Sequence, residues 1–157
     1  QISPNIYAEH MDINYMGVVN GLAAIVPQML AARGGHIVII SSVAGWRGLP
    51  KAAAYAPTKA ALIALAESLY FDLTPKNIKI QIMCPGFVDT EATAVNDFDM
   101  PDLLTAETAA EHIISGMESD IFSHDFPKSF TRKLKLLKFL PDRLYFALVK
   151  KQTGAKS

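Results

Sequence analysis

The sequence lacks the features that mark secreted and membrane-spanning proteins. Its 157 residues contain one cysteine, Cys84, so an internal disulfide framework is excluded. Polar residues and a proline interrupt the most apolar stretch, Gly17 to Leu30, before it reaches the about 18 apolar residues of a membrane span. The N-terminal residues also lack the basic and then apolar order of a secretion signal. We therefore expect no spanning helix, and the cytoplasm is the simplest location.

Metal chemistry and repeats are also missing from the sequence. No histidine or second cysteine lies at metal-ligand spacing from Cys84, which predicts a small buried residue and no metal site. No internal repeat or low-complexity tract is visible. Half of the residues are hydrophobic, which is enough to build the core of one domain.

The formal net charge is zero, but the charges are separated along the chain. From Phe126 onward nine basic side chains accompany one acid, Asp142, giving +8, and the preceding 125 residues carry −8. This separation predicts that the tail docks on its own acidic body, or meets an anionic partner or membrane surface. Because the tail lacks interleaved stacking aromatics, we expect no nucleic-acid partner.

Hydrophobic periodicity predicts an α/β fold with a parallel sheet. The first long helix is expected over Pro4 to Ala32, and its second half is apolar almost all round, which predicts burial on more than one side, in the core or against another subunit. Continuous apolar runs at 36–40 and 78–83 predict strands buried on both faces. A helix from about 54 to 73 between them makes a βαβ crossover.

The remaining elements follow the second strand. They are expected as a loop without periodicity over 84–105, a helix to about 119, a weak strand near 121–126, and short amphipathic helices at about 129–140 and 142–151. Phe130, Leu134 and Leu137 form one apolar stripe among lysines. That stripe predicts either a helix packed on its own sheet or a hydrophobic lid.

Tyr55 and Lys59 lie four residues apart at the start of the second helix, so both side chains occupy one face. A cation beside a phenol favours the phenolate, which predicts a lowered tyrosine pKa. In an open parallel sheet ligands bind outside the carboxyl ends of the strands, where Ser42 follows one strand and Pro85-Gly86 the next. A hydroxyl donor, a titratable phenol and a closely approachable backbone are therefore expected at one rim.

These motifs together resemble the short-chain dehydrogenase/reductase family. The matching pieces are DINYMG with Asn14, IVIISSVAG with Ser42, YAPTK with Tyr55 and Lys59, and PGFVDT from Pro85 to Thr90. The likeness runs from about Ile13 to Phe126 and fades in the tail. It implies a Rossmann-like, doubly wound parallel sheet and an oxidoreductase that transfers a hydride between NAD(P) and a secondary alcohol or ketone.

The resemblance also implies a role for each matching residue. Tyr55 would be the general acid or base, and Lys59 would bind the nicotinamide ribose and lower the tyrosine pKa. Ser42 would orient the substrate oxygen, and Asn14 would hold a water that links Lys59 to solvent. Tyr55 and Lys59 would share the cofactor with the residues of a lip at the nicotinamide end: Pro85, Gly86, Val88 and Thr90.

Some of these residues also have simpler interpretations. Asn14 could be only a polar helix residue, and Thr90 could be only the cap of a loop. Trp46 and Arg47 could line the substrate entrance or belong to a solvated loop. A non-catalytic relative that uses the same scaffold for binding or assembly remains the alternative to an enzyme.

A complete member of the family would begin with a strand and a TGxxxGxG turn that seats the pyrophosphate on a helix N-terminus. This sequence has no such turn, so we expect it to be the C-terminal portion of the fold, without the N-terminal βαβαβ half of roughly 90 residues. We expect these 157 residues by themselves to bind NAD(P) poorly and to be inactive. The choice between NAD and NADP cannot be read, because the selecting residue follows the missing second strand.

Two regions and three kinds of partner follow from these expectations. Residues 1–127 are expected to be the C-terminal part of the Rossmann-like catalytic domain. Residues 128–157 are expected to be basic amphipathic helices that cover a small, lipophilic substrate and contact a membrane surface peripherally. The resemblance further implies a homodimer or homotetramer, since the long first helix and the Tyr55 helix are similar to those of the family's four-helix interface.

Overall fold

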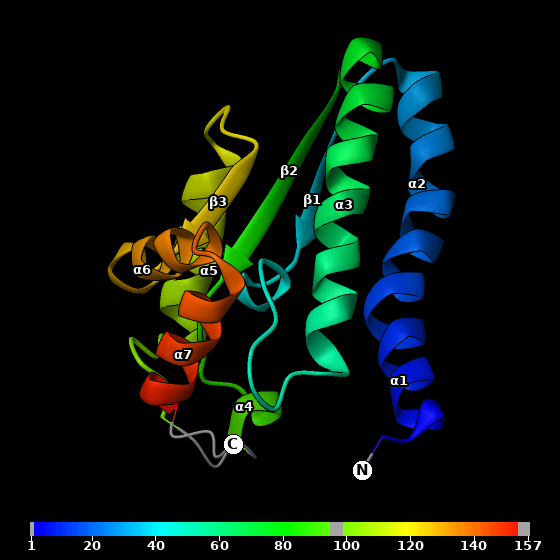
Figure 1. Cartoon of the computed structure of the whole chain (residues 1–157). Coiled ribbons are helices and arrows are strands. Elements are labelled where there is room, and N and C mark those ends of the chain that lie inside the picture. Colours follow the sequence, from blue (N-terminus) through cyan, green and yellow to red (C-terminus); the bar gives the residue numbers. More distant parts are fainter. Residues whose placement is uncertain (1, 95–98, 154–157) are drawn as a thin grey trace.

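The computed structural model describes residues 2–94 and 99–153. Its centre is a sheet of three parallel strands in the order β1-β2-β3, with β1 at Gly35–Ile40, β2 at Ile78–Pro85 and β3 at Ser123–Phe126. Ile37 pairs with Ile80, and Ile82 pairs with Ser123. The predicted parallel α/β fold is confirmed (Figure 1).

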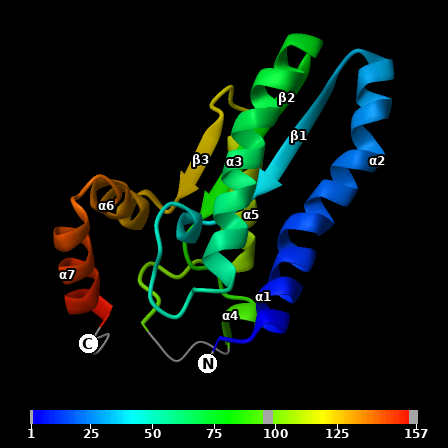
Figure 2. The ribbon, with the colours of Figure 1, turned by 45° about the vertical axis from the view of Figure 1, so that its right-hand side comes forward.

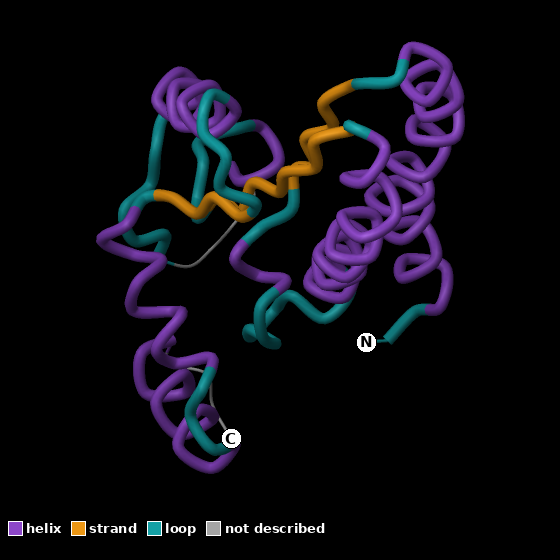
Figure 3. Tube along the Cα trace, turned by 90° about the horizontal axis from the view of Figure 1, so that it is seen from above, coloured by secondary structure: helices purple, strands orange, loops and turns teal. Residues whose placement is uncertain are grey.

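Helices surround the sheet. Their bounds are α1 Pro4–Met11, η1 Asp12–Met16, α2 Gly17–Ala32, η2 Val43–Gly45, α3 Tyr55–Leu73, η3 Thr74–Lys76, α4 Glu91–Ala94, α5 Ala106–Met117, α6 Lys128–Lys138 and α7 Asp142–Thr153. Figure 2 shows α2 and α3 running side by side, with α6 and α7 at the opposite end of the sheet. Seen from above, helices cover both sides of the strands (Figure 3).

The core lies between α3 and the strands β1 and β2. Leu62 and Ala66 of α3 are fully buried, and they are spaced by one turn, so they form one inward face. They meet the buried isoleucines of β2, whose side chains are continuous with Ile37 and Ile39 of β1. β-Branched residues suit a strand covered on both sides, which explains why the two apolar runs form the sheet.

The long N-terminal helix has the predicted extent but not the predicted burial. α1, the π-helical turn η1 and α2 are continuous from Pro4 to Ala32, and Pro27 lies inside α2 without ending it. Val18, Leu22 and Val26 pack against the core cluster, yet no residue of the three segments is fully buried. The expectation of a helix buried in the domain core is therefore wrong for this structure, because only one face meets the sheet and α3.

The same helix also corrects the expectation about membrane spans. By length and composition alone, Pro4–Ala32 is long enough and apolar enough to cross a membrane. The polar residues and the proline in its second half do not interrupt the helix, so the helix keeps the length of a membrane span.

The segment after β2 has more structure than the sequence predicted. Val88 forms a parallel bridge with Leu104, and the short helix α4 lies between them. The predicted substrate loop from 89 to 104 therefore has two ordered ends that meet. Residues 95–98 of that loop lie outside the described residues.

Helix α6 is attached to the end of β3 by a buried carboxylate. Asp125 is 2% exposed and forms ion pairs with Lys135 and, at 3.2 Å, with Lys128, both on α6. Burial by itself raises the pKa of Asp125, but the two lysines beside it outweigh burial and hold the pKa below its ordinary value. On the same helix Phe130 and Leu134 pack against the core, in agreement with a helix packed on its own sheet.

The loop between β1 and α3 lies directly against the helix. A Cβ on Gly45 would come within 2.7 Å of the Lys59 carbonyl carbon and 2.8 Å of the Ala60 nitrogen. Both are backbone atoms of α3, which cannot move aside as a flexible side chain would. Glycine at position 45 is therefore required for the loop to reach its place on α3.

We predict that Gly45→Ala destabilises the fold by about 1–3 kcal/mol, because the added methyl overpacks a rigid backbone contact. Urea unfolding followed by circular dichroism measures the change. Gly48→Ala is the matched control in the same loop, since a Cβ there meets nothing within 4 Å. Equal stability of the two variants would show that the loop has room to shift.

Candidate functional site

Three segments meet at the carboxyl rim of the sheet. Ser42 follows β1, Pro85 ends β2, and Tyr55 begins α3. The Ser42 hydroxyl donates to the Pro85 carbonyl oxygen at 3.5 Å and accepts from the Ala44 N–H at 3.2 Å. Ser42 and the end of β2 therefore meet, as the direction of the parallel strands predicted.

Tyr55 and Lys59 lie in the first turns of α3, on the rim side of the helix. The Lys59 Nζ lies 5.6 Å from the centre of the Tyr55 ring and donates to the Ile40 carbonyl oxygen at 3.3 Å. The neighbouring Ser41 hydroxyl donates to the Lys59 backbone carbonyl at 2.8 Å. Lys59 is therefore held to the end of β1 by both its side chain and its backbone.

The pKa directions at this pair differ from the sequence prediction. Burial raises the pKa of Tyr55, and a hydrogen bond with Ser42 lowers it only in part. Burial also lowers the pKa of the Lys59 ammonium. The predicted lowering of the tyrosine pKa by Lys59 is therefore wrong for this structure, because loss of solvent is the larger effect. Tyr55 keeps its proton at neutral pH and is suited to donate it.

Asn14 reaches the rim through a residue that the sequence did not single out. Its Nδ2 donates to the Thr58 hydroxyl at 3.2 Å, and that hydroxyl donates to the Tyr55 carbonyl oxygen at 2.7 Å. Thr58 is fully buried, and Asn14 lies in the π-helical turn η1. Asn14 thus contacts the first turn of α3 rather than the Lys59 side chain. Thr58 could have been singled out from the sequence, because it is a polar residue at an inward position of an apolar helix.

The predicted lip is ordered mainly by its own contacts. Thr90 caps α4, since its carbonyl oxygen accepts from Thr93 and Ala94 N–H groups at 3.0 Å. Its own N–H donates to the Thr93 hydroxyl at 2.9 Å, so the cap interpretation of Thr90 describes its contacts. A Cβ on Gly86 would lie 2.9 Å from a Phe130 ring carbon. A side chain at position 86 would therefore displace the Phe130 ring of α6.

The lip also contacts β3 and the loop that follows it. The Gly86 N–H donates to the Phe126 carbonyl oxygen at 2.8 Å, which extends the pairing of β2 with β3. Val88 is joined to Leu104 by the parallel bridge, with the Asp89 N–H donating to the Leu104 carbonyl oxygen at 2.8 Å. The backbone from Pro85 to Val88 therefore lies in a fixed position beside Ser42.

Arg47 joins the loop after β1 to the C-terminal helices. Its Nη1 donates to the Lys138 and Leu140 carbonyl oxygens at 3.0 and 2.7 Å, which have no partner further along α6. Its Nη2 donates to Asp142 at 2.6 Å, at the start of α7. One guanidinium thus caps the end of α6 and contacts the beginning of α7.

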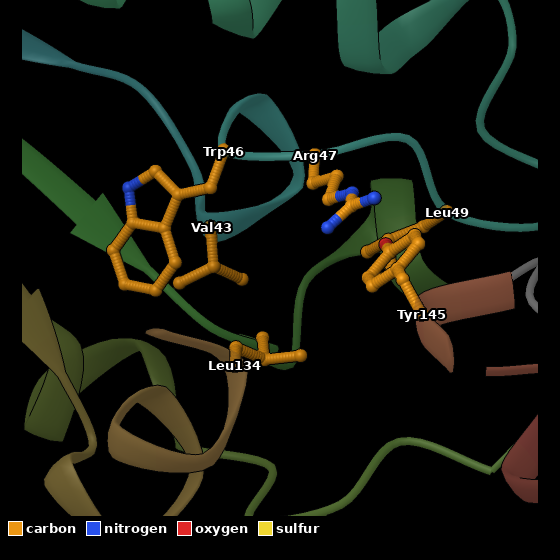
Figure 4. Close-up of a pocket in the computed structure, with 6 residues that line it drawn as sticks. All are labelled: Val43, Trp46, Arg47, Leu49, Leu134 and Tyr145. Carbon is orange, nitrogen blue, oxygen red and sulfur yellow. The ribbon is translucent and has the colours of Figure 1, made fainter. Parts of the chain in front are cut away.

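Tyr145 completes this connection from α7. The Arg47 guanidinium carbon lies 3.8 Å from the centre of its ring, and its hydroxyl donates to the Gly48 carbonyl oxygen at 2.6 Å. Figure 4 shows Arg47 beside Tyr145, with Trp46 and Val43 on the same loop and Leu134 opposite. The pocket between them has a volume of about 10 Å³, roughly the room for one water. Of the two interpretations of Arg47, the structure excludes a solvated loop.

A larger hollow of about 410 Å³ lies at the other end of the strands, where Gly35 and Ile78 begin β1 and β2. Tyr70 and Phe122 line it, and their rings are 5.3 Å apart. None of the predicted site residues borders it. The candidate chemistry is confined to the carboxyl rim.

Comparison with known proteins supports the family resemblance that the sequence motifs indicated. The family model described as short chain dehydrogenase matches residues 1–100. An uncharacterized oxidoreductase of Myxococcus xanthus is 36% identical over 141 residues, covering 90% of this chain and 56% of that protein. The chain spans about half the length of the curated relatives it matches.

Solved structures are similar as well. A 3-oxoacyl-[acyl-carrier protein] reductase with bound NAD from Brucella melitensis is 31% identical with a TM-score of 0.66, covering 80% of this chain and 52% of that one. A short-chain dehydrogenase from Burkholderia cenocepacia in complex with NADP has a TM-score of 0.78 at 23% identity, covering 92% and 58%. The second likeness is one of fold.

The matched residues include β1, β2, the helix α3 between them and every residue predicted for the rim. Because the family match extends over residues 1–100 of 157, the chain belongs to the short-chain dehydrogenase family.

Proposed function

We propose that this chain carries the proton-transfer site of an oxidoreductase that moves a hydride between NAD(P) and a secondary alcohol or ketone. The observation that carries the proposal is the convergence of Ser42, Tyr55 and Lys59 at one rim, with Ser42 bonded to the end of β2. Family membership supports the reaction class. The similar reductase with bound NAD supports the cofactor.

The donors at the rim fit the nicotinamide end of NAD(P). Lys59 Nζ has three donor positions and makes one hydrogen bond to a described residue, which leaves two for ribose hydroxyls. Tyr55 is 36% exposed, so a ligand can reach this residue beside that ammonium. The backbone from Pro85 to Val88 would hold the carboxamide side, with Thr90 ordering the loop. The bound cofactor would supply or accept the hydride.

The residues of the chain would handle the proton. During reduction the Tyr55 phenol donates its proton to the substrate oxygen, and its raised pKa keeps that proton available at neutral pH. The Ser42 hydroxyl donates a hydrogen bond to the same oxygen and stabilises the charge that develops there. Lys59 stabilises the phenolate that remains, and Asn14 steadies the first turn of α3 through Thr58.

We predict that Tyr55→Phe lowers kcat with a ketone about 10²- to 10⁴-fold, because the acid is removed while the ring is kept. Initial rates of NADH and NADPH oxidation with ethyl acetoacetate as the probe measure the loss, in a protein that joins these residues to an N-terminal cofactor-binding half. Tyr70→Phe, on the same helix and 42% exposed, is the control expected to keep full activity. Undiminished turnover of Tyr55→Phe contradicts the assignment. A wild-type protein that binds NADPH but reduces no ketone would favour the non-catalytic alternative.

We further propose that α6 and α7 form the outer wall of the substrate site and select a lipophilic ketone. The side chains between them and the rim loop are mostly apolar, with Val43 and Leu49 on the loop and Leu134 on α6. Arg47 and Tyr145 hold this wall in place. The division between the catalytic domain and the C-terminal helices at about residue 127 is part of this proposal.

Arg47→Ala is expected to raise KM for a long-chain ketone about tenfold with little change in kcat, because the wall loses its anchor while Tyr55 and Ser42 are untouched. Steady-state kinetics with short and long alkyl ketones measure the separate effects on KM and kcat. Arg47→Lys is expected to behave like Arg47→Ala, since an ammonium cannot bond several carbonyls and Asp142 in one plane. Arg143→Ala on α7 is the matched control. An unchanged KM in Arg47→Ala rules out the anchoring role.

We also propose that the protein assembles as a homodimer or homotetramer through the helices on one side of the sheet. Ile13 of η1 and Phe71 of α3 are 67% and 76% exposed, although both are large and apolar. Apolar side chains of this kind on adjacent helices favour a contact between copies of the chain. The same helices form the interface in members of the family.

Phe71→Asp is therefore expected to convert the oligomer to monomer, because a charge would be buried in an apolar interface. Size-exclusion chromatography with light scattering measures the mass. Leu103→Asp is the control, since Leu103 is exposed but lies in the loop before α5. A wild-type monomer, or an unchanged mass in Phe71→Asp, would contradict the proposed interface.

A further inference from the structure

The outer surface of the C-terminal helices carries large apolar side chains that no described residue covers. Leu136 of α6 and Phe139, the residue that directly follows α6, are 75% and 81% exposed. The inner face of the same helix is already used, because Phe130 and Leu134 pack against the core. The outer pair therefore contributes little to the packing of α6 on the sheet.

Leu136 and Phe139 lie on one strip at the C-terminal end of α6. They are three residues apart, so their side chains are neighbours on the helix surface. Lys133 precedes Leu136 by three residues, and Lys138 directly precedes Phe139. After the turn at Pro141, the first turn of α7 adds exposed Leu144 and Arg143. We call the surface of α6 and the first turn of α7 that holds these six residues the outer C-terminal surface.

The positive charges of the two helices are largely free. On α6 and α7, the exposed basic residues that form no ion pair with another described residue are Arg132, Lys133, Lys138, Arg143, Lys150 and Lys151. Lys128 and Lys135 are engaged by Asp125, and the only acid on either helix, Asp142, is paired with Arg47. The charge separation seen in the sequence is thus neutralised only in part within the described fold.

We propose that the outer C-terminal surface docks on an anionic lipid bilayer. Leu136 and Phe139 insert at the level of the headgroups, and the surrounding lysines and arginines lie over anionic lipids. An apolar strip flanked by basic residues is the composition of helices that lie in a membrane interface. With 11 and 12 residues, α6 and α7 are too short to span a bilayer, which takes about 20, so the contact is peripheral.

Charge complementarity favours lipid over the other candidates for this surface. A nucleic acid would use the cations but leave Leu136 unburied, since phosphates contact only charged and polar groups. A second copy placed face to face would oppose two tails of net charge +8. An anionic bilayer satisfies both the free cations and the exposed apolar pair. This docking does not depend on the proposed catalytic function.

Vesicle flotation with the purified protein tests the proposal. We expect binding to vesicles of phosphatidylcholine with phosphatidylserine, weak binding to phosphatidylcholine alone, and release at about 1 M salt, where the screening length is about 3 Å. Leu136→Ser with Phe139→Ser is expected to weaken binding at least tenfold. Ile114→Ser with Ile121→Ser is the matched control, because both isoleucines are more than half exposed but lie outside this surface.

Charge reversal gives a second test that avoids the apolar residues. Lys133→Glu with Lys138→Glu is expected to abolish binding, whereas Lys76→Glu on η3 leaves it unchanged. Circular dichroism and thermal melting establish that each variant is folded. Equal binding to neutral and anionic vesicles overturns the proposal, as does equal loss in the isoleucine control.

Two further outcomes would assign the surface to another partner. Duplex DNA that binds as tightly as the vesicles, with no effect of the Leu136 and Phe139 substitutions, would point to a nucleic acid. A concentration-dependent dimer that those substitutions dissociate, without vesicle binding, would point to a second copy of the chain. Either result contradicts lipid docking while leaving the ketone reductase assignment intact.

Discussion

The contact between Gly45 and the backbone of Lys59 is the constraint on which the candidate site depends. Because no Cβ fits between the two segments, the loop after β1 lies flat on the first turns of α3. The Ser41 hydroxyl adds a bond from the end of β1 to the Lys59 carbonyl oxygen. The position of Tyr55 relative to Ser42 is thus set by backbone contacts, which are stiffer than contacts between long side chains. A site for proton transfer needs such stiffness, since small displacements of the acid cost large factors in rate.

The same loop also holds the C-terminal helices. Arg47 supplies donors to the carbonyl oxygens at the end of α6, which would otherwise remain unsatisfied. Asp125 holds the beginning of that helix from the end of β3. With one attachment at each end, α6 is coupled both to the rim loop and to the sheet. The coupling explains why the pocket beside Arg47 is almost filled, and it makes the outer wall of the site part of the folded structure rather than a loose tail.

Much of the architecture was predictable because it depends on local signals. Apolar β-branched runs and flanking glycines and prolines indicate the strands and the ends of most helices. The rule that parallel strands share a carboxyl rim brings Ser42 close to Pro85. Contacts between distant polar groups were not predictable in this way. Asn14 meets Thr58 across 44 positions, and Arg47 meets Leu140 across 93. Periodicity indicates which face of a helix is buried, but it does not indicate which polar group will form a hydrogen bond with a residue on that face.

The electrostatics at Tyr55 and Lys59 show why spacing alone predicted the wrong pKa direction. Attraction between a phenolate and an ammonium falls with distance, and the Lys59 Nζ lies 5.6 Å from the Tyr55 ring centre while bonding to the Ile40 carbonyl oxygen. Burial acts on each group separately and shifts both toward their neutral forms. Tyr55 and Lys59 lie on the same face of α3 as the core residues Leu62 and Ala66, but nearer the beginning of the helix, and they are not part of the core cluster. Groups kept at such a cost, with perturbed pKa values and at the rim where ligands of parallel sheets bind, are characteristic of functional sites.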